Sequence, residues 1–352
     1  MSKAIKLGIS IGDTNGVGLE VILKSFHDKR ILDLCTPILF GDYKLAIKTK
    51  KQLGLDDVYL NKIQSVKDCE KKKVNIINCW KEELNPTLGN NTPDGGKYAL
   101  KSLECASQSL KNKEVDVLVT APINKENIQS DSFKFPGHTE FLEQQFEGQA
   151  LMLMLNKELR IGVVTGHLPL EQVSKHITQE LILQKLESFN QSLIQDFGIR
   201  KPKIAVLGLN PHAGDNGLLG QEEEKTIIPA LQKAEDKGLL AFGPFPADGF
   251  FGSNQLKAFD GVLAMYHDQG LVPFKTLSFG NGVNFTSGLS VVRTSPDHGT
   301  AFDIAGKNIA SESSFIQAIY TACDVYKKRQ EWQELNCNIL PFHAKKEKSR
   351  ER

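Results

Sequence analysis

The stretch Ile204-Ala-Val-Leu-Gly-Leu209 is an apolar run that passes directly into the polar turn Asn210-Pro-His212-Ala-Gly214. Three other phrases also place a histidine just after an apolar run or a glycine; they are Phe135-Pro-Gly-His138-Thr139-Glu140, Val164-Thr-Gly-His167-Leu-Pro169 and Met265-Tyr-His267-Asp268. In α/β proteins, catalytic residues concentrate where strands end and loops begin, at the carboxyl edge of the sheet. Because four of the eight histidines share this context, the sequence predicts an active site at such an edge.

Apolar runs recur along the chain, and amphipathic segments lie between them. Several of the runs are almost continuously apolar, which is typical of strands covered on both faces. The predicted strands are Ile5–Ile11, Pro37–Phe40, Val74–Ile77, Val115–Thr120, Ile161–Thr165, Ile204–Leu209 and Gly261–Met265. This alternation predicts an α/β fold with a largely parallel sheet.

Two of the intervening segments carry helical patterns. The clearer one has apolar residues at three- and four-residue spacing from Ile182 to Phe197. Thr178 is a candidate N-cap before it, and Gly198 is a plausible stop after it. The second helix is predicted from Tyr98 to Leu110.

The length and composition of the chain limit which functions are possible. A chain of 352 residues can bury a large core and form one large domain or two. The 43 basic and 42 acidic residues leave a net charge of +1, so nothing in the overall charge favours nucleic acid or an anionic membrane. We find no signal peptide, no apolar run that could span a bilayer and no CxxC pair, so we expect a cytoplasmic protein with free thiols.

Three of the histidines form a candidate metal site. His167, His212 and His267 come from separate strand ends and could meet at one edge of the sheet, where a metal would keep open positions for a substrate. Each histidine taken alone is better explained as a loop residue, but the three together favour the metal. Asp248 and Asp268 could orient an imidazole or take a proton, although an Asx-turn would also explain them.

Lys275, Asn284 and Arg293 form a candidate anion site. Arginine offers a bidentate fork and lysine a point charge, so their convergence on one cleft would bind a phosphate or a carboxylate. Ordinary solvated surface charge explains these residues equally well at this stage.

Loop-like segments surround these candidates. The phrase Gly8–Glu20 is glycine-rich but fits neither GxGxxG nor GxxxxGK[ST], so a tight turn is favoured over a phosphate site. The segment Ser295–Lys307 is long and polar, and would let a ligand approach the backbone closely. Asn85–Lys97 is also predicted to be a loop, and the charged tail Lys345–Arg352 is predicted to fray.

Taken together, the phrases resemble those of the 4-hydroxythreonine-4-phosphate dehydrogenase family of vitamin B6 biosynthesis. Any one motif is weak, but the ordered set is specific and covers most of the chain up to Lys307. The matching phrases, besides the opening glycine-rich one, are Thr120-Ala-Pro-Ile-Asn-Lys125, Gly137-His-Thr-Glu140, Thr165-Gly-His-Leu-Pro-Leu170, Leu209-Asn-Pro-His-Ala-Gly214, Tyr266-His-Asp-Gln-Gly-Leu271 and Arg293-Thr-Ser-Pro-Asp-His-Gly-Thr-Ala301.

The resemblance implies an α/β fold like that of the isocitrate and isopropylmalate dehydrogenases, in which two α/β domains flank an active-site cleft. It implies a first domain of residues 1–125 with 300–352 and a second of residues 126–299 that carries the metal ligands and dimer contacts. The protein would be a homodimer with its active site at the subunit interface.

The resemblance also implies roles for individual residues. His167, His212 and His267 would bind one divalent metal (Zn, Mg, Co or Mn), with one ligand supplied across the dimer. The resemblance further assigns His138, Thr139, Lys275, Asn284 and Arg293 to the substrate, and Asp297, His298, Gly299, Thr300 and Ala301 to NAD or NADP. His138, Asp248 and Asp268 are the candidates for catalysis, and the sequence leaves open which of them is the general base.

The implied reaction is NAD-dependent oxidation of 4-phosphooxy-L-threonine to 2-amino-3-oxo-4-phosphooxybutanoate, which decarboxylates to 3-amino-2-oxopropyl phosphate. The chain departs from the family pattern at Thr14-Asn15, at Asp215 and in Thr286-Ser-Gly-Leu-Ser290. A dehydrogenase of another phosphorylated four-carbon acid, threonate or erythronate 4-phosphate, is therefore the alternative. A regulatory protein that binds metal and nucleotide without turnover is a second, less favoured alternative.

Overall fold

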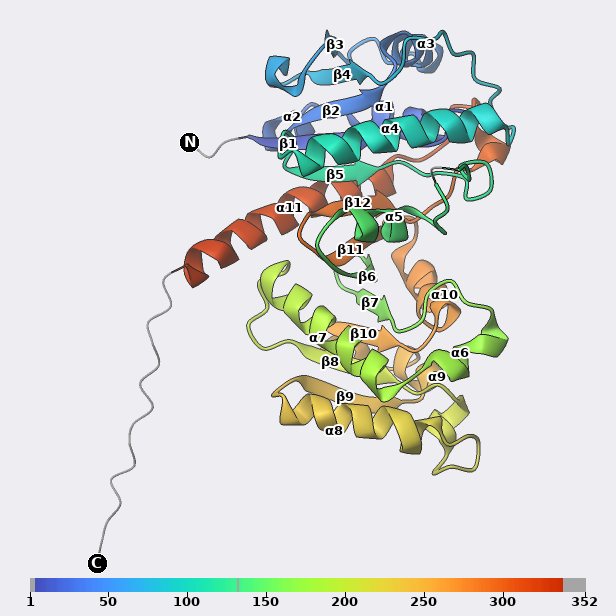
Figure 1. Ribbon diagram of the computed structural model, residues 1–352, viewed down its shortest axis with the longest axis vertical. Helices are drawn as coiled ribbons and strands as arrows, with labels where there is room; N and C mark the ends of the chain where they lie inside the picture. Colours follow the sequence, from blue (N-terminus) through green and yellow to red (C-terminus); the bar gives the residue numbers. More distant parts are fainter. Residues whose placement is uncertain (1–3, 132, 338–352) are drawn as a thin grey trace, which may run out of the picture.

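The computed structural model describes residues 4–131 and 133–337, and within them twelve strands form one mixed sheet (Figure 1). The order of neighbouring strands is β3-β4-β2-β1-β5-β12-β11-β6-β7-β10-β8-β9. The strands are β1 (Ile5–Ser10), β2 (Cys35–Gly41), β3 (Leu60–Ile63), β4 (Val74–Asn78), β5 (Val117–Thr120), β6 (Gly148–Leu155), β7 (Arg160–Val163), β8 (Lys203–Leu207), β9 (Leu240–Phe245), β10 (Gly261–Ala264), β11 (Val283–Leu289) and β12 (Arg293–Pro296).

Two blocks of parallel strands are joined by an antiparallel seam. In the first block β3, β4, β2, β1 and β5 pair in parallel, and β12 joins β5 in the same direction. In the second block β7, β10, β8 and β9 pair in parallel. Strand β11 runs antiparallel to both β12 and β6, and β6 runs antiparallel to β7. The seam therefore lies in the middle of the sheet, where the two blocks meet.

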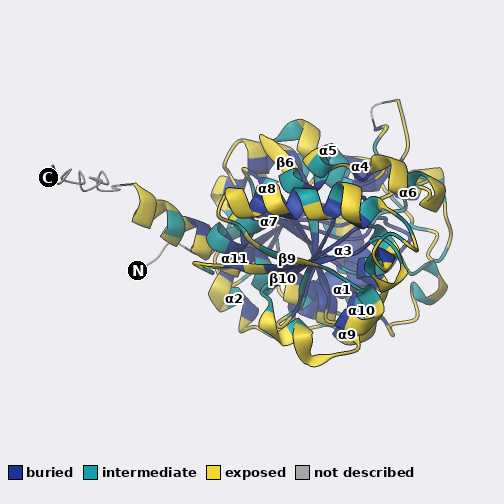
Figure 2. Cartoon of the chain, turned by 90° about the horizontal axis from the view of Figure 1, so that it is seen from below, coloured by how far each residue is buried: buried dark blue, intermediate teal, exposed yellow. Residues whose placement is uncertain are grey.

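Helices cover the sheet. They are α1 (Gly18–Ser25), α2 (Ile31–Leu34), α3 (Tyr43–Leu53), α4 (Pro93–Lys111), α5 (His138–Gln145), α6 (Leu170–His176), α7 (Gln179–Gln195), α8 (Ile228–Asp236), α9 (Ala247–Phe251), α10 (His267–Ser278) and α11 (Ser313–Asn336). Figure 1 shows α4 lying across β1 and β5, and α11 returning from the end of the chain to pack on β5, β11 and β12. At the seam α7 packs on β6 and β11, and in the second block α10 packs on β7 and β10. Figure 2 shows the strands as a buried centre surrounded by helices whose outer surfaces are exposed.

The α/β fold with a largely parallel sheet is confirmed. All seven predicted strands form, and each observed end lies within two residues of its predicted position. Strands β2 and β10 are buried along their whole length, which explains their continuous apolar sequences. The predicted helix before Gly198 is α7; the Thr178 hydroxyl accepts a hydrogen bond from the backbone N–H of Leu181 at 3.1 Å, and Gly198 takes a φ of +71°.

The loop prediction for Asn85–Lys97 is wrong at its end, because α4 already begins at Pro93. Thr92 caps this helix by accepting a hydrogen bond from the Gly95 N–H at 3.2 Å, and proline is well suited to the first turn because no N–H is needed there. The two glycines that follow tolerate close packing: a Cβ on Gly96 would lie 2.0 Å from the carbonyl oxygen of Asn127.

The predicted division into residues 1–125 with 300–352 and residues 126–299 stays a prediction, because one sheet runs through both parts. The charged tail Lys345–Arg352 lies outside the described residues. Among the described residues, none of the helices combines the length and the apolar character needed to cross a bilayer.

Candidate active site

A cavity of about 210 Å³ gathers most of the predicted site residues. It lies where α5, α10, β11 and β12 meet the loops that follow β5, β7 and β12. The predicted residues that line it are His138, His167, His267, Lys275, Asn284, Arg293, Asp297, His298 and Gly299. The structure thus brings together candidates that are up to 161 positions apart in the chain, from residue 138 to residue 299.

His167 and His267 face each other in this cavity. Their ring centroids are 5.6 Å apart, and the ring planes are inclined by 43°. His267 Nδ1 lies 2.7 Å from Asp268 Oδ1, and His167 Nδ1 lies 3.6 Å from Glu140 Oε1. A carboxylate on Nδ1 orients an imidazole so that Nε2 can face a cation. These two side chains therefore suit a divalent metal in donor type, and at His167 the ammonium group of Lys125 lies 3.1 Å from Nε2.

His212 does not line this cavity. It lies in the short helical turn Pro211–Gly214, where His212, Ala213 and Asp215 all have positive φ values. The buried carboxylate of Glu223 holds this turn by accepting hydrogen bonds from the N–H groups of Leu209 and Asn210 at 2.7 and 2.8 Å. Within residues 4–131 and 133–337 of a single chain, no three His, Cys, Asp or Glu side chains come together as a metal site. The predicted trio is thus incomplete in one chain.

Other predicted residues lie outside the cavity. Asp248 is in the first turn of α9 and Thr139 follows His138 in α5, and neither lines the cavity. Asp268 contacts His267, and its side chain is 76% exposed. One chain therefore places only Asp268 of the two predicted carboxylates next to the candidate metal ligands.

Arg293 carries a buried positive charge in the cavity. It is 2% exposed, and its hydrogen bonds in the described part of the chain go to the hydroxyls of Thr120, at 3.0 and 2.6 Å, and of Thr286, at 3.1 Å. Burial lowers the pKa of Arg293 to about 9, and the charge of Glu140 opposes this effect. A buried cation without a bonded carboxylate is costly unless an anion binds to it.

Two further polar groups lack partners. Within the described residues, His138 Nε2 and Asn284 Oδ1 are buried and make no hydrogen bond. Burial lowers the pKa of His138 well below its usual value, and the charges of Arg293 and Lys125 add to this effect, so the imidazole is neutral. Because buried polar atoms are normally hydrogen-bonded, these two atoms indicate a polar ligand in the cavity.

Sequence reasoning gave no role to Lys125 and Glu140, which belong to the site. Lys125 follows β5 and lines the cavity, and its ammonium group lies 3.1 Å from His167 Nε2. Glu140 faces His167, and this contact is the main reason why its pKa is lower than usual. Both lie in phrases that the resemblance uses, but their neighbours in sequence do not reveal that they converge on His167.

The predicted cofactor loop packs against the turn that follows β1. The N–H of Val17 donates to the carbonyl oxygen of Thr300 at 3.0 Å, and a Cβ on Gly16 would lie 2.7 Å from that oxygen. Asp297 Oδ1 accepts a hydrogen bond from the Ser314 hydroxyl at 3.0 Å. Gly12 has a φ of +70°, and the Gly16 N–H donates to the Asp13 carbonyl oxygen at 3.1 Å, which confirms a tight turn within the glycine-rich phrase, between β1 and α1.

Comparisons with known proteins agree on one family. Residues 33–322 match the family model described as pyridoxal phosphate biosynthetic protein PdxA. The chain is 49% identical to a 4-hydroxythreonine-4-phosphate dehydrogenase of Bacteroides thetaiotaomicron over 96% of its own length and 93% of that protein. It is 38% identical to a D-threonate 4-phosphate dehydrogenase of Cupriavidus necator, over 92% and 98% of the two chains. A crystal structure of 4-hydroxythreonine-4-phosphate dehydrogenase from Klebsiella pneumoniae has a TM-score of 0.77 and 32% identity, and covers 93% of this chain and 98% of that one.

Proposed function

We propose, from the premise that this chain belongs to the PdxA family of pyridoxal phosphate biosynthetic proteins, that it oxidises 4-phosphooxy-L-threonine with NAD. The product would be 2-amino-3-oxo-4-phosphooxybutanoate, which decarboxylates to 3-amino-2-oxopropyl phosphate. The names of its relatives establish a PdxA-type dehydrogenase; the substrate, the cofactor and the metal are the content of the proposal. The observation that carries it is the buried Arg293, which has no bonded carboxylate and shares a cavity with His167 and His267.

Substrate binding would use the cations and the unpartnered polar atoms of the cavity. Arg293 and Lys275 attract the anionic ends of the substrate. The unpartnered Asn284 Oδ1 accepts a hydrogen bond from the substrate amino or hydroxyl group. Neutral His138 offers a hydrogen bond through Nε2, which has no partner in the described chain. The pKa of His138 lies well below its usual value, which suits a neutral imidazole that positions the substrate; its predicted part in catalysis stays a prediction.

His167 and His267 would hold a divalent metal (Zn, Mg, Co or Mn), and His212 from a second copy of the chain would complete the set. Such a metal, when bound, lowers the pKa of the substrate hydroxyl. Asp268 and Glu140 orient the two imidazoles of this chain through their Nδ1 atoms. A carboxylate takes the hydroxyl proton. Asp268 is available in this chain, and Asp248 would serve from the second copy.

NAD or NADP would bind along the loop of Asp297, His298, Gly299, Thr300 and Ala301, and when bound it supplies the acceptor for the hydride. Within this loop His298 and Gly299 reach the substrate cavity. The His298 Nε2 atom is buried without a hydrogen-bond partner in the described chain, so it is free to contact the cofactor. The loop would therefore bring a polar group that has no hydrogen-bond partner in the described chain close to the bound substrate.

The alternative substrate is a phosphorylated four-carbon hydroxy acid, because some relatives are named D-threonate 4-phosphate dehydrogenases. The substrates differ in whether an amino or a hydroxyl group stands next to the carboxylate. The departures at Ser287 and Ser290 are relevant here, because Ser287 directly follows Thr286, whose hydroxyl contacts Arg293. The ratio of kcat/KM for 4-phosphooxy-L-threonine and D-threonate 4-phosphate decides between them.

The test is to measure NADH formation from both acids, before and after treatment with a chelator, in the wild type and in His267→Ala. We expect turnover that a chelator removes and added metal restores, and we expect none in His267→Ala. His176→Ala is the matched control, because His176 is an exposed histidine on α6 outside the cavity. Full activity after complete metal removal contradicts the metal role, and dinucleotide binding without reduction by either acid contradicts the dehydrogenase proposal.

A further inference from the structure

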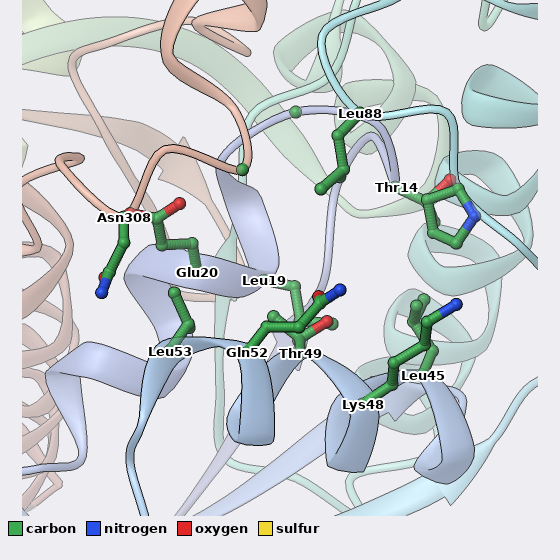
Figure 3. A pocket seen from close by; sticks show the side chains of 13 residues that line it. Thr14, Leu19, Glu20, Leu45, Lys48, Thr49, Gln52, Leu53, Leu88 and Asn308 are labelled. Atoms are coloured by element: carbon green, nitrogen blue, oxygen red, sulfur yellow. The ribbon is translucent and has the colours of Figure 1, made fainter.

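Two further cavities differ in what surrounds them. Figure 3 shows one of about 210 Å³ between α1, α3 and the loop that carries Asn308, in the region of the loop proposed for NAD or NADP. The other is larger, at about 540 Å³, and lies between α11, the turn from β6 to β7 and the end of α7. We call it the rear groove, and the residues that matter below are Leu155, Lys157, Arg160, Phe197, Val283 and Tyr320. Among the described residues, none lines both the rear groove and the substrate cavity, so the two are separate.

The rear groove and the substrate cavity lie on opposite faces of the sheet. In β6, Leu155 lines the rear groove, whereas its neighbour Met154 lines the substrate cavity. In β11 the same holds for Val283 and Asn284. Neighbouring residues of a strand point to opposite faces, and Leu155 pairs with Val283 while Met154 pairs with Asn284. One layer of strands therefore separates the rear groove from the substrate cavity.

The rear groove also spans the two blocks of parallel strands. Gln317 and Tyr320 come from α11, which packs on β5 and β12 of the first block. Arg160 begins β7 of the second block. Arg329 of α11 holds Asp196 at the end of α7 through a hydrogen bond of 2.6 Å from Nε to Oδ1, which neutralises this carboxylate of the groove. A ligand in the rear groove would therefore contact both blocks at once.

Arg160 is half-buried and has few bonding partners. Its Cζ atom lies 4.9 Å from the ring centroid of Phe197, so the aromatic ring covers one face of the guanidinium group. Within the described residues, Nη1 donates to the carbonyl oxygen of Asp260 at 3.3 Å, and Nε is buried without a partner. Burial lowers the pKa of Arg160, and the charge of Asp260 opposes this effect. An anion that reaches this guanidinium group would offset the cost of its burial.

The lysines of the rear groove differ in whether they have an anionic partner. Lys328 Nζ lies 2.7 Å from Glu331 Oε2, and Lys327 Nζ lies 3.9 Å from Asp324 Oδ1. Lys157 is exposed and forms no ion pair within the described residues. It belongs to the same hairpin as the guanidinium group described above. One short segment therefore presents two positive charges that have no bonded carboxylate.

We propose that the rear groove binds a small phosphate monoester, with the phosphate between Arg160 and Lys157 and the organic part against Tyr320. A phosphate monoester carries nearly two negative charges and three acceptor oxygens at neutral pH, so it matches these two cations better than a carboxylate does. Asn281 and Gln317 are exposed amides of the groove that can donate to the remaining oxygens. The volume of about 540 Å³ lies within the usual range of small-molecule sites, about 300–1,000 Å³. The groove therefore has room for an organic group besides the phosphate.

A ligand in the rear groove would act on the substrate cavity from the other face of the sheet. It would touch Leu155 and Val283, whose strand neighbours Met154 and Asn284 line the substrate cavity. It would also tie the two blocks of strands together. Closure and product release limit kcat in many enzymes, so this restraint should lower kcat without competition for the substrate. The binding itself does not depend on the proposed reaction.

The test measures binding without turnover. Phenyl phosphate is titrated into the full-length protein in a calorimeter, and inorganic phosphate and 4-phosphooxy-L-threonine are titrated separately. A phosphate monoester also enters the substrate cavity if the proposed function is right, so the titrations are made in the wild type and in Arg293→Met. We expect two molecules of phenyl phosphate per wild-type chain and one per Arg293→Met chain, because only the rear groove then keeps its cations.

Two variants should remove the site that remains in Arg293→Met. Arg160→Met and Lys157→Glu should each weaken phenyl phosphate by about tenfold or more, the effect of losing roughly 1.4 kcal/mol, as for a hydrogen bond to a charged group. Lys71→Glu is the matched control and should bind normally, because Lys71 is an exposed turn lysine outside the groove. Lys157→Glu decides the question if Arg160→Met does not melt like the wild type, because the side chain of Lys157 is exposed.

Initial rates at saturating phosphorylated acid test the effect on turnover, because competition in the substrate cavity is then suppressed. Phenyl phosphate should lower kcat in the wild type and in Lys71→Glu but not in Lys157→Glu. Without phenyl phosphate, the three proteins should have the same kcat and KM. An unchanged wild-type kcat, with phenyl phosphate bound in the rear groove, contradicts the effect on turnover and leaves the binding site in place.

The binding results decide the site and its ligand. If Arg293→Met binds no phenyl phosphate, or if Lys157→Glu binds it as tightly as Lys71→Glu, the rear groove is not a phosphate monoester site. Inorganic phosphate that binds as tightly as phenyl phosphate also contradicts the proposal, because the organic part then makes no contact. Equal binding of 4-phosphooxy-L-threonine in the groove supports the proposal and identifies the substrate as a ligand, whereas much weaker binding supports an aromatic ester. If neither acid is oxidised but the groove binds phenyl phosphate, the proposed function is wrong and this site stands.

Discussion

Replacing Arg293 with methionine should make the protein more stable and less active. Burial lowers the pKa of Arg293 from 12.5 to about 9, which corresponds to a cost of about 5 kcal/mol for keeping the charge inside, since one pH unit is worth about 1.4 kcal/mol. Methionine removes this cost but leaves the hydroxyls of Thr120 and Thr286 without their donor, at about 1–2 kcal/mol each. The free energy of unfolding should therefore rise by about 1–3 kcal/mol, in the range seen when buried charges are replaced by apolar side chains.

Activity should change in the opposite direction. Losing one member of a buried, hydrogen-bonded charge pair costs about 2–5 kcal/mol, so kcat/KM should fall at least about thirtyfold. Urea unfolding measures the stability and initial rates measure the activity, and Arg30→Met is the control because the side chain of Arg30 is 88% exposed. A clearly less stable Arg293→Met protein would show that Arg293 serves the fold. Unchanged kcat/KM would show that no anionic group of the substrate reaches it.

The remaining predictions concern pH, assembly and a helix end. The pKa of His138 is lowered in the folded state, so the unfolded chain takes up a proton first as the pH falls below about 6.5, and the free energy of unfolding decreases on acidification. In urea titrations, His138→Gln should lose less of this free energy than the wild type between neutral and mildly acidic pH. Mixing inactive His212→Ala and His267→Ala chains should restore up to about a quarter of wild-type activity. Half of the dimers are then mixed, and each mixed dimer holds one intact site out of two. If activity does not recover although subunit exchange is verified, the three imidazoles must come from one chain. Thr178→Ala removes the cap of α7 and should lower the free energy of unfolding by about 1 kcal/mol, and a change below a few tenths would show that the cap is dispensable.

Local sequence patterns predicted the elements whose burial is uniform. Strands such as β2 and β10 are covered on both faces, so nearly every residue is apolar and the run stands out. The strands β11 and β12 were missed because they bury polar side chains, among them Thr286, Ser287 and Thr294. These groups are satisfied only by the packed structure: the Thr294 hydroxyl, for example, bonds the carbonyl oxygen of Ala318 in α11. A pattern of apolar residues cannot reveal a strand that is stabilised in this way.

Residue types and their spacing along the chain were enough to predict the α/β class, the loop positions of the histidines and, from the ordered phrases, the family. These properties depend on residue type and short spacing, which are local. The folded chain was needed to show that Lys125 and Glu140 meet at His167, that Arg293 is buried without a bonded carboxylate, and that His212 lies apart from His167 and His267. Those facts depend on which distant segments the sheet order brings together, and on side-chain directions that no single segment specifies.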